Sequence, residues 1–273
     1  MEDSQVGAVK PDVLTPAETE AKLETIGLNK ANMPLVRSIL LGILAGLFIG
    51  MGGMMLGLVL STPDIPFFVT RIIGGLVFCI GLVLVLLSGA ELFTGNNLII
   101  VATLSKKVTW GAYSKNLILI WVTNLIGSLI AVAIVYFSGF GDMNGGAIAT
   151  TYANLAAAKV AIPPLTLFFK ALLCNMLVCL AVWMSFAGRT FVDKFFAVLF
   201  PITAFVACGG EHSVANMFFL PLGYVYNLVG GGLAAIDLGG IVYNLGVVTI
   251  GNMVGGIVFV GIFYWGAFHK KPR

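Results

Sequence analysis

Six stretches of the chain are apolar for long enough to cross a lipid bilayer, and this feature restricts the fold more than any other. They lie near residues 35–60, 67–104, 110–137, 165–187, 195–219 and 243–268. About 20 apolar residues in a helix cover the hydrocarbon core of a bilayer. Only 10% of the 273 residues are charged and 59% are hydrophobic, which excludes a soluble domain of this size because its surface would be largely apolar. The sequence therefore predicts an all-α membrane protein with six transmembrane helices.

The distribution of positive charge predicts the orientation in the membrane. Twelve of the fifteen Lys and Arg residues lie in the N-terminal segment, in the connections after the second and fourth stretches, and at the C-terminus. Because cytoplasmic loops carry an excess of these residues, both termini are expected in the cytoplasm. Arg71, Lys159 and Lys170 remain on the opposite side. The net charge of +3 results from this bias and gives no reason to expect a nucleic-acid partner.

The two ends of the chain are polar and flank a membrane domain that we place at residues 35–268. Residues 1–34 contain six acids and three lysines, and they lack the apolar core of a secretory signal. Within them, residues 17–28 suit a short amphipathic helix on the membrane surface, although a solvated cytoplasmic tail is the favoured interpretation. Residues 269–273 are expected to form a second cytoplasmic tail.

Two of the apolar stretches are interrupted by related patterns of small residues. Residues 89–96 read Gly-Ala-Glu-Leu-Phe-Thr-Gly-Asn, and residues 209–216 read Gly-Gly-Glu-His-Ser-Val-Ala-Asn. The pairs Asn116/Asn124 and Asn244/Asn252 recur in the same order in the two halves, so an internal duplication is indicated.

The repeats span about residues 35–137 and 165–268. Each contains three spans, an odd number, so the second copy must enter the membrane from the opposite side. Inverted repeats with broken helices place the functional site of many transporters near the midplane. The backbone groups that a break frees are tolerated only inside protein or beside a wet cavity. We therefore expect the second and fifth helices to be broken there.

Glu91 and Glu211 are the only acids inside the spans, and a carboxylate at this depth needs a partner. One interpretation is a proton or cation site. The favoured alternative is structural: each Glu accepts hydrogen bonds from the freed amides of its own break. The adjacent His212 has Leu92 as its counterpart in the first repeat. This asymmetry favours a functional histidine that exchanges a proton or donates a hydrogen bond.

Three further polar residues have both a structural and a functional interpretation. Thr94 either caps the helix that follows it or offers a hydroxyl donor to an ion. Asn175 bonds either a solute or a neighbouring helix. Lys159, in a long loop from 138 to 164, is either solvated or part of a basic mouth that concentrates anions.

The remaining unusual residue types indicate packing rather than chemistry. Cys79, Cys174, Cys179 and Cys208 all fall inside the spans, with spacings that fit no metal template. Glycines at 42, 46, 50 and 53 have the small-xxx-small spacing of closely packed membrane helices. No nucleotide-binding or catalytic motif is present, so neither a cofactor nor an enzymatic activity is expected.

Four segments of the chain are similar to the formate/nitrite transporters of prokaryotic membranes. They read GAELFTGNN (89–97), KKVTWGAYSKN (106–116), NMLVCLAVWMS (175–185) and GEHSVANMFFLP (210–221). The resemblance implies an aquaporin-like, six-helix channel domain that assembles as a homopentamer in the prokaryotic cytoplasmic (inner) membrane, with one pore per subunit. It implies passage of small monovalent anions of weak acids, namely formate, nitrite or hydrosulfide, with protons as a second partner.

The resemblance also assigns roles to individual residues. It implies that Thr94 lies in the loop that narrows the pore, that His212 is the central histidine, and that Lys159 attracts the anion. It also implies that Asn175 lines the same chamber and that Leu92 and Phe205, with Phe78 and Leu82, form an outer hydrophobic constriction. Independently of the resemblance, we expect Glu211 and Asn216 in the pore, and structural roles at the breaks for Gly89, Glu91, Gly209 and Gly210. Gly210 departs from the bulky aromatic of many members, which puts the width of the inner constriction in doubt.

Two other classes of membrane protein remain as alternatives. An aquaporin-like channel for small neutral solutes shares the architecture but needs neither Lys159 nor His212. The sequence also lacks Asn-Pro-Ala pairs at the two breaks, which counts against a water channel. A membrane-embedded enzyme or redox subunit would require a cofactor. The anion channel is therefore the favoured interpretation.

Overall fold

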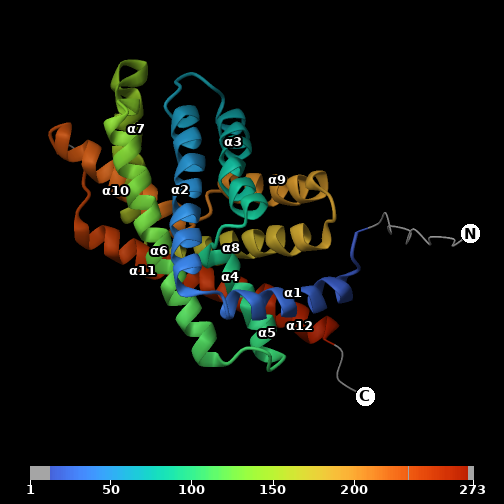
Figure 1. Cartoon of the computed structure of the whole chain (residues 1–273). Coiled ribbons are helices and arrows are strands. Elements are labelled where there is room, and N and C mark those ends of the chain that lie inside the picture. Colours follow the sequence, from blue (N-terminus) through green and yellow to red (C-terminus); the bar gives the residue numbers. More distant parts are fainter. Residues whose placement is uncertain (1–12, 233, 270–273) are drawn as a thin grey trace, which may run out of the picture.

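The computed structural model describes residues 13–232 and 234–269, and the regular elements in this range are all helical. The first half contains α1 (Pro16–Ala31), α2 (Leu35–Leu60), α3 (Phe67–Ser88), α4 (Phe93–Asn96), η1 (Asn97–Ile99), α5 (Ile100–Leu104) and α6 (Trp110–Phe137). The second half contains η2 (Phe140–Gly146), α7 (Ala147–Val160), α8 (Pro164–Ala187), α9 (Phe191–Ala207), α10 (Ser213–Val229), α11 (Leu238–Gly256), η3 (Ile257–Ile262) and α12 (Phe263–Phe268). Figure 1 shows α2, α3 and α6 crossing α8, α9 and α11.

Five helical segments of the described range are long and apolar enough to cross a membrane, which confirms an all-α, multi-pass membrane protein. They are α2, α3, α6, α8 and the continuous run from α11 to α12. The bounds of α2, α6 and α8 lie within one residue of the predicted stretches. The predicted stretch 195–219 corresponds to two shorter helices, α9 and α10. It ended too early because Tyr224, Tyr226 and Asn227 lower the hydropathy while α10 continues to Val229.

The long loop predicted at 138–164 is wrong, because η2 and the 14-residue helix α7 occupy most of it. Helix α7 buries Ile148, Tyr152, Ala156 and Lys159, which follow one another at about one helical turn and so lie on one face. The Tyr152 hydroxyl donates a hydrogen bond of 2.9 Å to the backbone oxygen of Gly53. The abundance of Ala and Thr gives this segment too little hydropathy to be recognised as a membrane helix.

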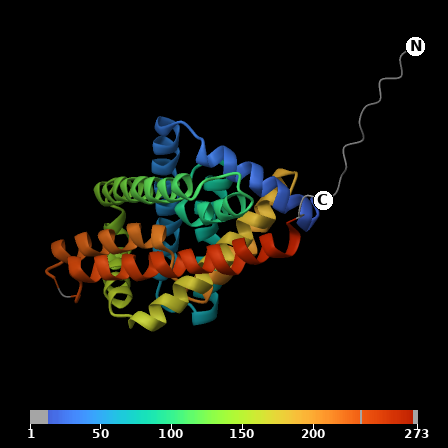
Figure 2. The same cartoon turned by 90° about the horizontal axis from the view of Figure 1, so that it is seen from below.

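The favoured solvated tail is also wrong for its described part, because α1 is a docked helix. Thr15 caps α1, and Glu18 completes a capping box. The helix packs against η1, α5, α8 and α12, and Figures 1 and 2 both show its first turns beside α12. Its buried face carries Glu20 and Glu24 as well as Leu23. Residues 1–12 and 270–273 of the predicted tails lie outside the described range.

The glycine stripe of α2 packs as predicted, because its members lie directly against α6 and α10. A Cβ atom added to Gly50 would lie 2.6 Å from the Cβ of Ala131, and one added to Gly53 would lie 2.6 Å from the Phe218 ring. Such distances leave no room for a methyl group.

Gly50→Ala should therefore lower the free energy of unfolding by about 1–3 kcal/mol through overpacking. Gly246→Ala is the matched control, because a Cβ there meets nothing within 4 Å and Ala favours a helix by up to about 1 kcal/mol. Thermal unfolding in detergent measures both variants. Equal stability of the two variants would show that α2 and α6 adjust without strain.

Candidate functional site

Two short non-helical connections face each other in the middle of the helix bundle. The chain leaves α3 at Gly89 (φ 78°) and α9 at Gly209 (φ 75°), and both conformations favour glycine. The next backbone amides donate matching bonds, Ala90 to the oxygen of Val85 at 2.9 Å and Gly210 to the oxygen of Phe205 at 2.8 Å. Helices α4 and α10 begin three residues further on.

A buried asparagine holds each connection in place. Asn252 donates to the backbone oxygens of Ala171 (2.8 Å) and Glu211 (2.9 Å), and its Oδ1 accepts from the amide of Ser213 at 2.8 Å. In the first half, Asn124 makes the equivalent three bonds to the oxygens of residues 42 and 91 and the amide of residue 93. The freed backbone groups are therefore satisfied by asparagine side chains.

The carboxylates of Glu91 and Glu211 are each paired with a lysine. Lys159 Nζ lies 2.8 Å from both carboxylate oxygens of Glu211, and Lys30 Nζ lies 2.7 Å from Glu91 Oε1. Asn96 and Asn216 donate to Glu91 and Glu211 at 2.8 and 2.7 Å, respectively. Within the described residues these carboxylates bond to side chains, which corrects the expectation that each Glu accepts from the freed amides of its own break.

Lys30 is a site residue that the sequence analysis missed. It is the last residue but one of α1, as Lys159 is of α7. Its backbone oxygen accepts a hydrogen bond from Asn116 (3.3 Å), and that of Lys159 accepts one from Asn244 (2.9 Å). The signal was present, because Lys30 and Lys159 are 129 residues apart, within one residue of the 128 that separate Asn116 from Asn244. It was not used because residues 1–34 were assigned to a tail.

His212 and Thr94 meet across the two connections. The Nε2 atom of His212 lies 2.8 Å from the Thr94 hydroxyl oxygen, and both residues are buried. The backbone N–H of Ala215 donates to Nδ1 of His212 at 3.1 Å, so His212 caps α10. Because Nδ1 must offer a lone pair to that donor, the ring proton resides on Nε2 and is donated to Thr94. The Thr94 hydroxyl proton is then free to serve another acceptor.

Three cavities lie in sequence through this region. The first, about 340 Å³, is lined by Lys159, His212, Phe78 and Phe205, and by the other two predicted outer cations, Arg71 and Lys170. The second, about 10 Å³, holds at most about one water molecule and lies between His212 and Leu92. The third, about 30 Å³, lies under α1 and is lined by Lys30, Leu82 and Leu92.

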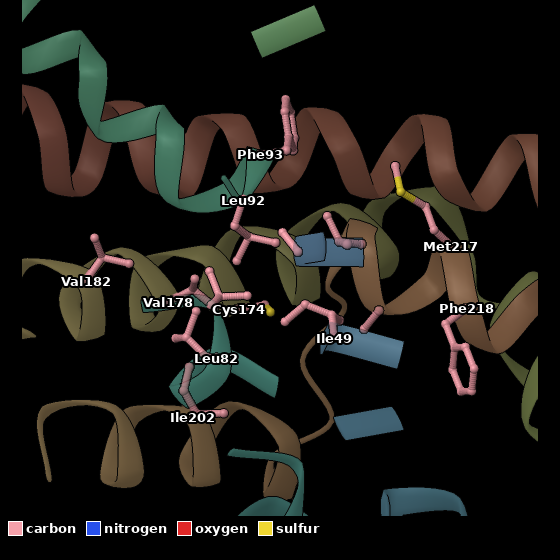
Figure 3. Close-up of a cluster of buried hydrophobic side chains, with 14 of the residues drawn as sticks. Ile49, Leu82, Leu92, Phe93, Cys174, Val178, Val182, Ile202, Met217 and Phe218 are labelled. Carbon is pink, nitrogen blue, oxygen red and sulfur yellow. The ribbon is translucent and has the colours of Figure 1, made fainter. Parts of the chain in front are cut away.

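One small cavity is bordered by all four predicted constriction residues, Phe78, Leu82, Leu92 and Phe205. Phe78 and Phe205 border both the large cavity and the small one, whereas Leu82 and Leu92 border the small cavity and the one beside Lys30. Figure 3 shows Leu82 and Leu92 turned toward each other with Ile49, Val178 and Ile202 around them. Leu92 and Phe205 therefore share the small cavity, with Phe205 also bordering the Lys159 cavity and Leu92 the Lys30 cavity.

Asn175 and Gly210 take positions that differ from the expectation. Asn175 lies behind Thr94, where its Nδ2 donates to the backbone oxygens of Asn252 (2.7 Å) and Thr94 (3.4 Å). Neither Asn175 nor Thr94 borders any of the three cavities, whereas His212 borders two of them. Gly210 lines the large cavity beside Lys159, and a Cβ there would lie 3.1 Å from Cys174 and from the oxygen of Phe205. A larger side chain at 210 would therefore narrow the Lys159 side.

Proteins of known function resemble this chain over most of its length. The family model described as "Formate/nitrite transporter" matches residues 17–266. The formate channel FocA of Escherichia coli (strain K12) is 36% identical over 270 residues, which cover 93% of this chain and 94% of that protein. A solved structure described as a pentameric formate channel with formate bound has a TM-score of 0.79 and 37% identity, covering 86% of this chain and 98% of the other. The aquaglyceroporin of Plasmodium falciparum, at 16% identity and a TM-score of 0.55, shares the fold alone over 86% of this chain and 98% of its own.

Proposed function

The chain belongs to the formate/nitrite transporter family, and we propose that it is a channel for small monovalent anions of weak acids, with formate and nitrite as the first candidates and hydrosulfide as the third. The family consists of channels and transporters, not enzymes. One observation carries the proposal: two cavities that each contain a paired lysine flank an apolar constriction. Lysine at both entrances suits an anion, and a neutral solute needs neither ion pair.

We infer that the protomer is an inverted repeat of two three-span halves with the second and fifth helices broken. The support is the matched set of asparagine, glutamate and lysine contacts at the two connections. The related pentameric formate channel supports a homopentamer with one pore per subunit. The positive-charge bias supports cytoplasmic termini in the inner membrane, so that Lys30 lies at the inner entrance and Lys159 at the outer one.

In the proposed mechanism, Lys159 with Arg71 and Lys170 concentrates the anion in the outer cavity. A bare charge then meets the Phe78 and Phe205 rings, where desolvation costs several kcal/mol. The hydroxyl of Thr94 donates to the anion at this point, since its oxygen already accepts the proton on His212 Nε2. The first possible role of His212 is therefore to orient the Thr94 hydroxyl.

A proton relay through His212 is the second possibility, and the cap of α10 counts against it. To become an imidazolium, His212 must protonate Nδ1 and lose the hydrogen bond from Ala215. The new charge would also face the N-terminus of α10, where the helix dipole is positive. We propose that the main role of His212 is to orient the Thr94 hydroxyl. Proton coupling, where present, uses the acid form of the substrate.

The function is tested with purified protein in liposomes. Flux of formate, nitrite and hydrosulfide is compared across pH, and anion current is recorded in planar bilayers. We expect saturable flux of at least one of these anions together with measurable current. Passage of glycerol or water without any anion current would support the neutral-solute channel instead.

His212→Asn separates the two roles of the histidine. Asn is among the best N-cap residues, so the variant keeps the α10 cap, but it is too short to reach Thr94 and does not titrate. We expect flux to fall about 10-fold or more, because the Thr94 hydroxyl is then no longer oriented toward the anion, and a hydrogen bond to a charged group is worth about 1.5–3 kcal/mol. We expect the pH dependence of the residual flux to stay unchanged. Loss of that pH dependence would instead favour the relay, and Thr94→Val should match the fall in flux.

A further inference from the structure

Three potential metal ligands meet away from the pore, where α1 lies beside the C-terminal helix (Figure 2). Glu20 and Glu24 are one turn apart on the buried face of α1, and His269 directly follows α12. One ligand atom of each lies within 4.8 Å of the other two. The three side chains border an open cavity of about 450 Å³. They belong to none of the three cavities along the pore.

One carboxylate oxygen in this cluster is buried without a partner. Glu20 Oε1 accepts no hydrogen bond within the described residues, although Glu20 is only 3% exposed. His269 Nδ1 is 3.4 Å from Glu20 Oε1 and already lies 2.9 Å from Glu24 Oε1. Glu24, in contrast, is paired with Lys107 at 2.6 Å.

The spacing of the three groups suits a small divalent ion. Ligand atoms about 2.1 Å from a tetrahedral ion lie about 3.4 Å apart. The distances from His269 Nδ1 to the two carboxylates, 2.9 and 3.4 Å, are close to this value. One imidazole and two carboxylates favour a first-row metal over Ca²⁺, which takes about six to eight oxygen ligands. The adjoining cavity leaves room for water as a further ligand.

We propose that Glu20, Glu24 and His269 bind one first-row divalent metal ion, with Zn²⁺ as the best match. The ion gives the buried Glu20 Oε1 a partner where no hydrogen bond supplies one. It also joins α1 to the segment after α12. These elements are already linked by the contacts of His269 with the two carboxylates and by Ser105, which donates to Glu24 and accepts from Trp265. The Trp265 ring stacks on His269 at 5.0 Å and holds the imidazole toward α1.

The test uses the full-length protein without a polyhistidine tag, stripped with EDTA and titrated with ZnCl₂ by calorimetry. We expect saturable binding of one ion per chain and a rise in melting temperature. Glu20→Gln and His269→Gln should each weaken binding by at least about 10-fold, since outer-shell partners alone change affinity by about 10–100-fold. Both exchanges keep the size of the side chain, and size-exclusion chromatography verifies the assembly.

Glu18→Gln is the matched control. It removes a carboxylate from the same helix and the same cavity, while its amide oxygen still accepts the Thr15 cap bond. We expect wild-type zinc affinity in this variant. Equal weakening by Glu18→Gln would indicate diffuse attraction and overturn the site, as would the absence of saturable Zn²⁺ binding. With Co²⁺, the wild type should show d–d absorption that His269→Gln abolishes, and unchanged bands would place the metal elsewhere.

Discussion

Lys159→Gln should lower anion flux at least about 10-fold, because it leaves the Glu211 carboxylate unpaired beside the anion path. The two side chains are 11% and 6% exposed and lie 2.8 Å apart. A unit charge about 4 Å from a like charge is repelled by about 4 kcal/mol at the dielectric constant typical of protein. Removal of one partner of a buried pair also costs about 3–5 kcal/mol of stability. Flux into liposomes and thermal unfolding measure the two effects.

Two further variants identify the cause of that loss. Lys170→Gln removes the same charge from the same cavity, but Lys170 has no ion pair among the described residues, so we expect a smaller loss of flux that high salt reduces further. The double variant Lys159→Gln/Glu211→Gln has neither charge of the ion pair. We expect this double variant to recover most of the stability and part of the flux, since Arg71 and Lys170 keep the cavity positive. Wild-type flux in Lys159→Gln would contradict the proposed role of this lysine.

The spans were predictable because polar backbone and charge are so costly in lipid. The ranges Leu35–Leu60 and Trp110–Phe137 contain one cationic residue each, and polar or turn-forming residues mark their ends. The position of the two non-helical connections after α3 and α9 was predictable for a related reason. A glycine-rich segment with a single acid is tolerated at membrane depth only where its backbone N–H and C=O groups find hydrogen-bond partners inside the protein.

Helices α1 and α7 were not predictable from hydropathy, because their buried faces are partly polar. α1 buries Glu20 and Glu24 only because Lys107 and His269 lie opposite in space, far from them in sequence. α7 buries Lys159 against Glu211 in the same way. The inferred repeat offered another way to predict these helices, since α7 precedes the second half as α1 precedes the first.

The grouping of the constriction residues also depended on three-dimensional structure. Leu92 and His212 occupy matching places in the two connections, and Phe205 lies one helical turn before the second. Sequence position alone does not say which cavity each side chain faces. Only the crossing of the two connections brings Leu92 and Phe205 to one small cavity, where Leu92 also borders the Lys30 cavity and Phe205 the Lys159 cavity.

Asn252→Leu should prevent accumulation of folded protein, because it leaves three buried backbone groups without partners. The amide of Ser213 and the oxygens of Ala171 and Glu211 lose their bonds to this side chain. Each unsatisfied group costs about 1–3 kcal/mol. The sum approaches the whole stability of a typical domain, about 5–15 kcal/mol. Yield and size-exclusion profile in detergent measure the outcome.

The same exchange at two other asparagines shows whether the loss arises from the helix connection. Asn227→Leu removes two bonds to Ala234 in a partly exposed turn, where water replaces the lost partner, so we expect a loss of about 1 kcal/mol or less. Asn124→Leu removes the equivalent three bonds in the first half and should be as damaging as Asn252→Leu. If Asn124→Leu folds normally while Asn252→Leu does not, the two halves are held by different interactions, and the inferred repeat does not extend to their energetics.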